Sequence, residues 1–311
     1  MASDKATGEP GMVDIRRILC AIDFSDMSRH ALEHAVAIAK WYGSRITALH
    51  VLHPPPFLPQ PPIFFADPAE GAPSRLTERA AAEELLRAWL DAPTRAGIGT
   101  DMLIDDGTPA AHILARANSL AADLIVMGTH GLSGFERFML GSVAEKVLRK
   151  ATCPVLTVPP AAATVAKVPY TRVLCPVDFS DSSLAALKFA FSLAEESDAH
   201  LTILHVFEWE PDRDLVIDGF DMGAYRRQLE EDARGRLEKL VTDDVRVWCK
   251  PATSVSHGKA YRRILETAER EASDVIVIGF RGRSPLDVAL FGSTTTQVVR
   301  LASCPVLTLR Q

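Results

Sequence analysis

The chain repeats itself, and this duplication constrains its fold more than any other feature of the sequence. Arg17–Asp26 returns almost unchanged as Arg172–Asp181, 155 positions later, and Thr152–Thr157 returns as Ser303–Thr308, 151 positions later. The second copy is therefore shorter by four residues in its middle. A period of about 150 residues indicates a duplicated domain, because solenoid repeats have periods of about 20–50 residues.

The repeat predicts two domains, at residues 14–159 and 171–311, which agrees with a length of 311 residues at about 100–200 residues per domain. Residues 160–170 between them are rich in Pro and Ala and follow neither the helical nor the strand period. We interpret this segment as a linker.

Within the first copy, short apolar runs alternate with amphipathic stretches. A continuous apolar run such as Arg17–Ile22 is typical of a strand buried on both faces. We expect Ser25 or Asp26 to cap the first helix and Pro93 to end the second. The expected strands are 17–22, 45–52, 100–104, 123–127 and 154–158; the expected helices are 27–42, 74–91, 107–121 and 142–150. This order predicts an α/β, Rossmann-like domain with a five-stranded parallel sheet and helices on both faces.

Composition narrows the possible partners and the location of the protein. The net charge of −6 and the pI of about 5.9 argue against nonspecific nucleic-acid binding. No run of about 18 apolar residues predicts a membrane span, and the first 17 residues lack the apolar core of a signal peptide. The five cysteines are odd in number and form no Cys-x-x-Cys pair. Reduced thiols in the cytoplasm are the simplest interpretation.

The pattern Gly-x2-Gly-x9-Gly-Ser occurs in both copies, between a predicted strand and a predicted helix. Glycine permits positive φ and removes Cβ atoms from the path of a ligand, and a helix N-terminus favours phosphate. The pattern is neither a Walker A loop nor the tighter motif of dinucleotide-binding folds. The candidate phosphate-binding residues are Gly128, Gly131, Gly141, Ser142 and Val143 in the first copy, and Gly279, Gly282, Gly292, Ser293 and Thr294 in the second.

The alternative is that both glycine pairs form structural turns without a ligand. Identical spacing in two copies favours phosphate binding. The second loop differs inside the pattern, where Phe280 and Arg281 replace Thr129 and His130. Its arginines could bind phosphate or could simply be solvated.

An aspartate follows the first strand of each copy, at the sheet edge where the glycine loops also lie. Asp23 and Asp178 could each accept a hydrogen bond from a ribose hydroxyl, as acidic residues do in related α/β folds. Each could instead cap the turn before the next helix. The pattern alone leaves these two interpretations even, and the nearby glycine loop favours a ligand.

Taken together, these motifs resemble the universal stress protein family in its tandem two-domain form and in its ATP-binding branch. The resemblance covers nearly all of Arg17–Leu309 and implies an adenine nucleotide alpha hydrolase-like fold that binds ATP, with or without Mg²⁺. It places Asp23 and Asp178 near the adenosine. It adds Ala21 and Pro176 to the site, and the backbones of Val51 and Val206 as partners of the adenine.

The resemblance also implies that the fifth strands pair, so Val155–Val158 and Val306–Leu309 are expected to pair antiparallel within the chain. A homodimer stays open. The second copy departs from the first in several places. Ala21 stands where the second copy has Pro176, as the family commonly does, and Thr108-Pro109 is replaced by Lys259-Ala260. His257 replaces Asp106. These differences leave room for one site to be weaker or empty.

Three other features are interpreted as structural. His30 and His34 fit a His-x-x-Glu-His zinc pattern, but the second copy does not keep them and no third ligand is evident. His50 and His205 are interpreted as packed strand-end histidines rather than bases. Ser25 and Ser180 are interpreted as helix caps, because neither has a partnered His–acid pair. No catalytic residue and no metal ligand is assigned.

The leading hypothesis is an ATP-binding regulatory protein of the stress response that binds adenine nucleotide in each domain without efficient turnover. The second hypothesis is an enzyme, either a slow ATPase or a nucleotidyl-transfer relative of this fold. The third is a nucleotide-independent scaffold for protein partners.

Overall fold

A computed structural model of the chain describes residues 13–53, 74–131, 140–162, 168–209, 216–217, 220–280 and 293–310. The segment 54–73, which the sequence predicts to be irregular, lies outside these residues. So do the central parts of both glycine loops, 132–139 and 281–292, which include Gly282 and Gly292.

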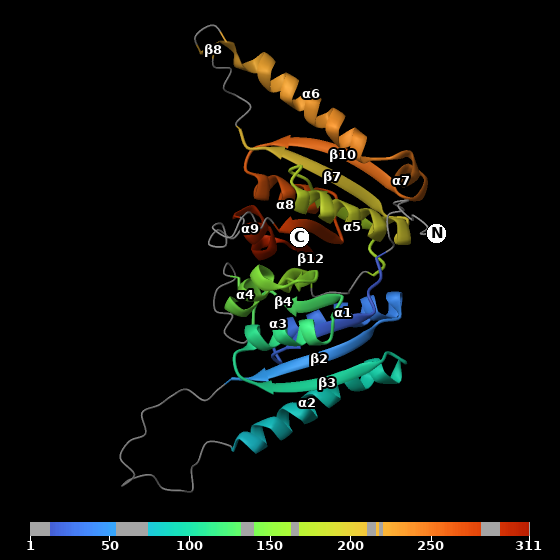
Figure 1. The fold of residues 1–311 in the computed structure, drawn as a ribbon, viewed down its shortest axis with the longest axis vertical. Coiled ribbons are helices and arrows are strands. Elements are labelled where there is room, and N and C mark those ends of the chain that lie inside the picture. The colour runs from blue at the N-terminus through green and yellow to red at the C-terminus, as the bar shows by residue number, and fades with distance from the viewer. Residues whose placement is uncertain are drawn as a thin grey trace, which may run out of the picture.

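Each copy folds into the alternating strands and helices that the sequence predicts (Figure 1). The first comprises β1 (Arg17–Ile22), α1 (Asp26–Tyr42), β2 (Arg45–Leu52), α2 (Arg75–Arg95), β3 (Thr100–Asp106), α3 (Pro109–Ser119), β4 (Leu124–Gly128), α4 (Ser142–Lys150) and β5 (Val155–Val158). The second comprises β6 (Arg172–Pro176), α5 (Asp181–Ser197), β7 (His200–Phe207), α6 (Met222–Leu240), α7 (Asp243–Trp248), β10 (Lys250–His257), α8 (Ala260–Arg270), β11 (Val275–Phe280), α9 (Ser293–Leu301) and β12 (Val306–Arg310). A two-stranded ribbon, β8 (Val216–Ile217) with β9 (Phe220–Asp221), precedes α6.

The two copies share one ten-stranded sheet of order β10-β7-β6-β11-β12-β5-β4-β1-β2-β3. Neighbouring strands are parallel within each copy. At the centre of the sheet, β5 and β12 pair antiparallel, which is the pairing that the resemblance to the family implies. The fold is thus α/β with a mainly parallel sheet, built from two tandem domains.

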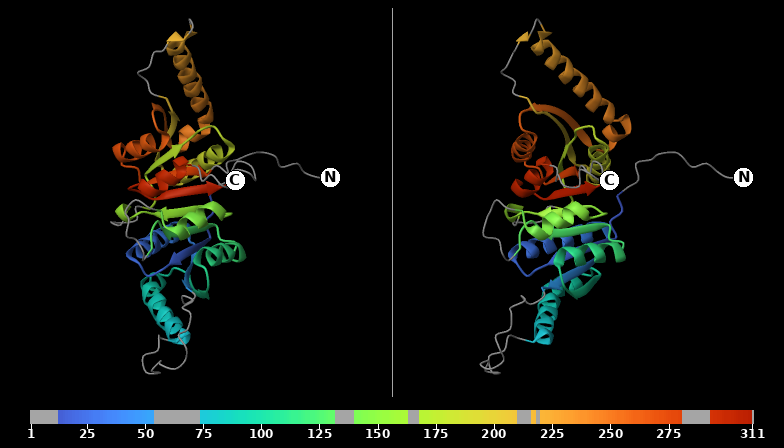
Figure 2. Two further views of the ribbon diagram at one scale, coloured as in Figure 1. Left: turned by 90° about the vertical axis from the view of Figure 1, so that its left-hand side faces the viewer. Right: turned by 60° about the vertical axis from the view of Figure 1, so that its left-hand side comes forward.

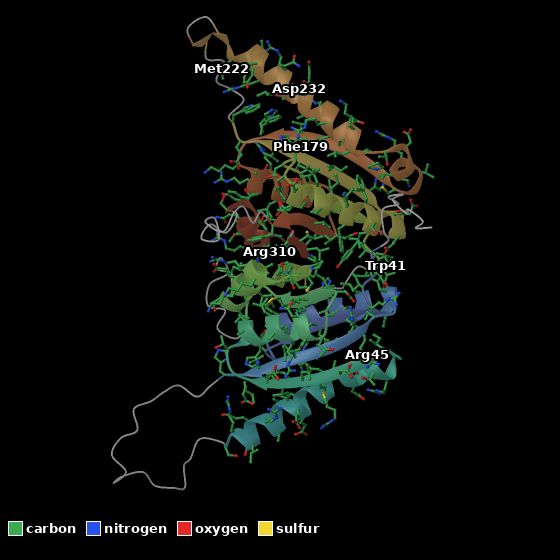
Figure 3. The ribbon with its side chains drawn as sticks, in the orientation of Figure 1. Trp41, Arg45, Phe179, Met222, Asp232 and Arg310 are labelled. Carbon is green, nitrogen blue, oxygen red and sulfur yellow. The ribbon has the colours of Figure 1, made fainter. Side chains whose placement is uncertain are left out.

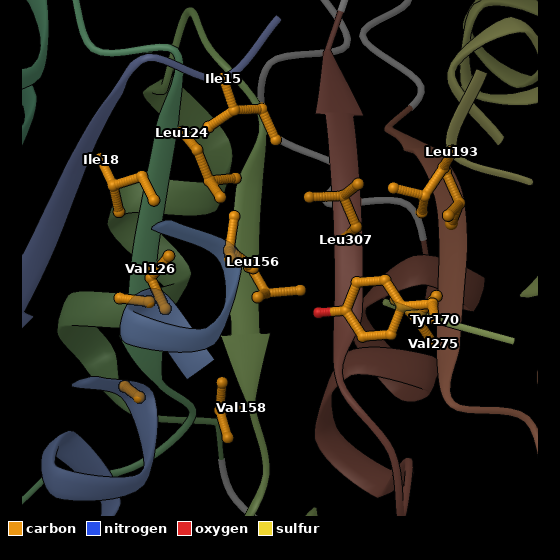
Figure 4. Packing of buried hydrophobic residues seen from close by; sticks show 14 of the residues in the cluster. Ile15, Ile18, Leu124, Val126, Leu156, Val158, Tyr170, Leu193, Val275 and Leu307 are labelled. Atoms are coloured by element: carbon orange, nitrogen blue, oxygen red, sulfur yellow. The ribbon is translucent and has the colours of Figure 1, made fainter. Parts of the chain in front are cut away.

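The β5–β12 seam is held by backbone pairing and by side chains of both strands. Leu156 is paired with Leu307 in the register, and both are buried in the same cluster (Figure 4). The Thr157 hydroxyl donates to the Val306 carbonyl at 3.1 Å, and the Thr308 hydroxyl donates to the Val155 carbonyl at 3.2 Å. These reciprocal bonds satisfy two buried hydroxyls that would otherwise destabilise the interior.

One hydrophobic core covers each face of the sheet, and each core includes residues of both domains. The first lies beneath α1, α2, α5 and α6; the second lies beneath α3, α4, α8 and α9. Successive residues of β1 alternate between them, with Ile18 and Cys20 in the first core and Leu19 in the second. This is the reason that the strands appear in the sequence as continuous apolar runs. Figure 2 shows the helical layers on both sides of the sheet.

Of the predicted helix ends, the cap of α1 is confirmed and the end of α2 is not. Ser25, rather than Asp26, is the N-cap of α1 and accepts from the Ser28 amide at 3.2 Å. The prediction that Pro93 ends the second helix is wrong, because α2 continues through it to Arg95. The Thr94 hydroxyl donates to the Leu90 carbonyl at 2.7 Å, so this carbonyl near the end of the helix has a side-chain partner. The proline nitrogen cannot donate to the Trp89 carbonyl, so one intrahelical hydrogen bond is missing in this turn.

Contacts between the domains are not restricted to the seam. The Val13 amide donates to the Ser192 hydroxyl of α5 at 2.7 Å. Trp41 of α1, labelled in Figure 3, packs edge-on against Tyr170 of the segment between the domains, with 6.4 Å between ring centroids. Part of the predicted linker, Pro160–Ala162, forms a 3₁₀ turn. None of the helices in the described ranges has an apolar stretch long enough to cross a membrane.

The seam generates a first prediction. We expect Leu307→Ala to lower the free energy of unfolding by about 2–5 kcal/mol, because the cavity it leaves lies between two paired strands. Urea denaturation followed by circular dichroism measures the change. The control is Leu76→Ala, whose side chain is 80% exposed and whose effect should stay within about 0.5 kcal/mol. Equal effects of the two variants would contradict the assigned role of the seam.

Candidate functional site

A cavity of about 500 Å³ lies where β1, β2 and β4 end, with α3 and α4 as walls. Its position past the carboxyl ends of parallel strands is where α/β sheets bind ligands, and its volume suits a small organic molecule. All the candidate binding residues of the first copy line this cavity: Ala21, Asp23, Val51, Gly128, Gly131, Gly141, Ser142 and Val143.

Asp23 holds the turn between β1 and α1. Its Oδ1 accepts from the Ser25 amide at 3.0 Å and from the Ser25 hydroxyl at 2.5 Å, and Phe24 between them has a φ of +64°. The turn-capping interpretation is therefore correct for this oxygen. A Cβ at Gly131 would lie 2.4 Å from Oδ2, so the other oxygen faces the glycine loop. A larger residue at position 131 would therefore have to displace the Asp23 carboxylate from its present position.

The glycine loop joins β4 to the start of α4. The Gly141 amide donates to the Thr129 carbonyl at 2.9 Å, which brings the two ends of the loop together. Gly141 is the N-cap of α4 and offers no side-chain hydrogen bond. Because the first amides of a helix have no intrahelical partner, those of Ser142 and Val143 are available to an anion at the cavity wall.

His50 has the structural role that the sequence predicts. Its Nδ1 lies 2.8 Å from the Ile22 carbonyl oxygen, and its ring packs against Phe24 with 4.6 Å between centroids. Burial lowers the pKa of His50, so its ring is neutral at pH 7 and donates through Nδ1. His205 repeats both contacts, with Val177 and Phe179, and burial lowers its pKa as well.

The cavity also contains residues that sequence reasoning did not select. His53, Thr129 and His130 line it, and the Thr129 side chain lies 2.9 Å from Nδ1 of His130. Thr129 is only 1% exposed. The signal that could have identified Thr129 and His130 is their position between Gly128 and Gly131 in the Gly-x2-Gly motif.

A buried ion network fixes α3 as a cavity wall. The Asp105 carboxylate is 8% exposed and accepts from Arg116 through Nε at 2.7 Å and Nη2 at 2.6 Å, and His112 Nδ1 lies 3.1 Å from it. The Arg116 hydrogen bonds hold the pKa of Asp105 below its usual value. The second copy has Ser256 and Thr267 at the positions of Asp105 and Arg116, so the network belongs to the first domain.

A matching cavity of about 340 Å³ lies at the ends of β6, β7 and β11. Asp178 repeats the turn of Asp23, with its Oδ1 accepting from the Ser180 amide at 3.0 Å and from the Ser180 hydroxyl. The candidate residues of the second copy that line this cavity are Pro176, Asp178, Val206, Gly279, Ser293 and Thr294. Gly282 and Gly292 lie outside the described residues.

The two histidines of the zinc-like pattern lie on α1, and His34 is 3% exposed. Burial lowers the pKa of His34. Within the ranges that the structure describes, no three His, Cys, Asp or Glu side chains gather as a metal site.

Comparison with known proteins finds universal stress proteins both by sequence and by fold. The family model described as the Universal stress protein family matches residues 14–159 and 169–310. A universal stress protein of Methanocaldococcus jannaschii is 39% identical over 147 residues, which span 46% of this chain and 81% of that protein.

Two solved structures extend the likeness to both domains. A universal stress protein from Archaeoglobus fulgidus has a TM-score of 0.66 at 24% identity, covering 94% of this chain and 98% of that one. A functionally unknown protein from Pseudomonas aeruginosa has a TM-score of 0.63 at 19% identity, covering 97% and 95%. At these identities the two structures establish the fold alone.

Gly279 generates a second prediction. A Cβ at this position would lie 2.4 Å from the Ser182 carbonyl oxygen, a backbone atom, so we expect Gly279→Ala to destabilise the protein by about 1–3 kcal/mol. Gly235→Ala is the control, because nothing lies within 4 Å of its Cβ in α6; it should stabilise by about 0.5–1 kcal/mol. Thermal denaturation distinguishes the two, and a stabilising Gly279→Ala would refute the close contact.

Asp105 generates a third prediction, which concerns pH. Since its folded pKa is depressed, its stabilisation is present above the unfolded value of about 3.9 and is lost as the pH falls through the folded value. We expect Asp105→Asn to lower the free energy of unfolding by about 1–3 kcal/mol at pH 7, and by progressively less below pH 4. The half-exposed Asp101, paired with Arg45, gives the control variant Asp101→Asn, with little effect at any pH. A cost of Asp105→Asn that does not change with pH would contradict this account.

Proposed function

We propose that this chain, which belongs to the universal stress protein family, binds ATP in its first cavity and a nucleotide in its second. We further propose that it acts as a regulatory protein of the stress response in the cytoplasm. We also propose that its first domain ends near residue 159 and its second begins near residue 171, with a linker between them.

The observation that carries this proposal is the convergence of the predicted residues of the first copy on one cavity. The cavity has three chemically different parts. The first amides of α4, with Ser142, suit phosphate. Asp23 suits a ribose hydroxyl. The side chains of Leu49, Val51 and Ile113 offer apolar surface for the base.

Mg²⁺ would enter with the phosphates. Asp23 is the one carboxylate among the described residues that line the first cavity. Mg²⁺ is commonly held by one or two carboxylates together with substrate phosphates and water. A metal at this site would therefore depend mainly on the nucleotide for its ligands.

Two contacts favour a binding protein over a rapid enzyme. Oδ1 of Asp23 is bonded to Ser25, and Nδ1 of His50 is bonded to the Ile22 carbonyl. Both groups thus hold the backbone at the cavity, which suits a preformed binding site.

The second cavity departs from the first at several positions, so we restrict ATP to the first domain. Calorimetric titration of the full chain with ATP should give one tight site. Asp23→Asn keeps an oxygen for the Ser25 cap but removes the charge. Because a hydrogen bond to a charged group contributes about 1.5–3 kcal/mol, we expect the variant to bind ATP at least about tenfold more weakly.

Asp178→Asn is the matched control, since it makes the same change in the other domain and should leave the tight site unaltered. Circular dichroism verifies that both variants fold. If the parent protein binds no ATP, or if both variants weaken binding equally, the proposed assignment of ATP to the first cavity is wrong.

A further inference from the structure

The two cavities differ at one corner through a pair of substitutions that touch each other. His53 follows β2 in the first domain, and Glu208 follows β7 at the matching position of the second. Pro109 begins α3, and Ala260 begins α8. All four residues line their cavities. Both residues at this corner therefore differ between the two domains.

The new pair is joined by a hydrogen bond. Ala260 has an N–H that Pro109 lacks, and this amide donates to Oε1 of Glu208 at 3.1 Å. The bond holds the carboxylate at the start of α8, where the helix dipole favours a negative charge. Among the described residues Glu208 forms no salt bridge.

Glu208 lies at the end of the cavity away from the phosphate-binding residues. Gly279 lies in β11 and Ser293 begins the next helix, α9, whereas Glu208 follows β7, and β6 lies between β11 and β7. At about 4.8 Å per strand, the two ends are separated by about 10 Å, which is the scale of a nucleotide. The surface beside Glu208 is apolar, with Leu204, Val206 and Ile264, and it suits a planar base.

A carboxylate at the base end restricts which base can be bound. An ionised carboxylate only accepts hydrogen bonds, so the facing edge of the base must donate them. Guanine presents two adjacent donors, the ring N1–H and the exocyclic amine. Adenine presents one amine beside a ring nitrogen that accepts, and this nitrogen would face the carboxylate with like polarity. A histidine at the same place, as in the first domain, can donate or accept and makes no such distinction.

We propose that Glu208 is a specificity-determining residue and that the second cavity takes a guanine nucleotide, while the first takes adenine. This inference rests on the proposed nucleotide binding and names the ligand of the second site. Oε1 of Glu208 is positioned by Ala260, and Oε2 remains to accept from the base together with the second lone pair of Oε1.

The experiment uses the full chain in the Asp23→Asn background, which weakens the first site. Calorimetric titration should show GTP binding at least tenfold more tightly than ATP. Adding Glu208→Gln should weaken GTP at least tenfold and change ATP less than threefold, because the amide cannot accept from both donors. Circular dichroism verifies that the variants fold.

A second variant tests the corner as a unit. Glu208→His with Ala260→Pro restores the residues of the first domain, and proline is favourable at the first helical position. This variant should lose the preference for GTP. The proposal is overturned if GTP binds no more tightly than ATP in the Asp23→Asn background. It is also overturned if Glu208→Gln strengthens both nucleotides equally, since Glu208 would then only repel anions. Neither outcome affects the separate test of ATP in the first cavity.

Discussion

The antiparallel pairing of β5 with β12 is the contact on which the rest of the structure depends. Each domain alone would leave the edge of its last strand unpaired, and such an edge is a template for aggregation. The seam pairs both edges within one chain and makes a single sheet of ten strands. It also joins the cores, because each hydrophobic cluster includes residues of both domains. Both cavities are formed at the strand ends of this shared sheet, so their geometry depends on a contact that contains no ligand-binding residue.

The sequence predicts the fold well because its strands are buried on both faces and its two copies confirm one another. For Asp23 the sequence left a turn cap and a ligand contact as alternatives, and the structure shows the hydrogen bonds of the turn to Ser25. Two features were not predictable in this way. Pro93 does not end α2, which continues through it to Arg95. Asp105 and Arg116 meet only after α3 packs against β2 and β1 of the sheet, and nothing in their spacing of eleven residues indicates an ion pair.

The domains have diverged through residues that contact one another. In the first domain Asp106 of β3 accepts from Arg79 of α2, with 3.0 Å between Oδ2 and Nη1. In the second, His257 of β10 lies 2.8 Å from Glu230 of α6. The outer helix therefore supplies the cation in one domain and the anion in the other. Phe179, labelled in Figure 3, shows the same kind of change. It packs under Arg236 of α6, whereas Phe24 packs against Trp89 of α2.

The twist of the sheet has a consequence for where the cavities open. An antiparallel seam alone would direct the strand ends of the two domains to opposite sides. However, β2 and β7 are seven steps apart in the sheet, and at roughly 20–25° per step the accumulated twist is roughly 140–175°. This rotation nearly cancels the reversal at the seam. Both strands end on the left of Figure 1, and so do β3 and β10. The two cavities, which lie at the ends of these strands, therefore lie on the same side of the molecule.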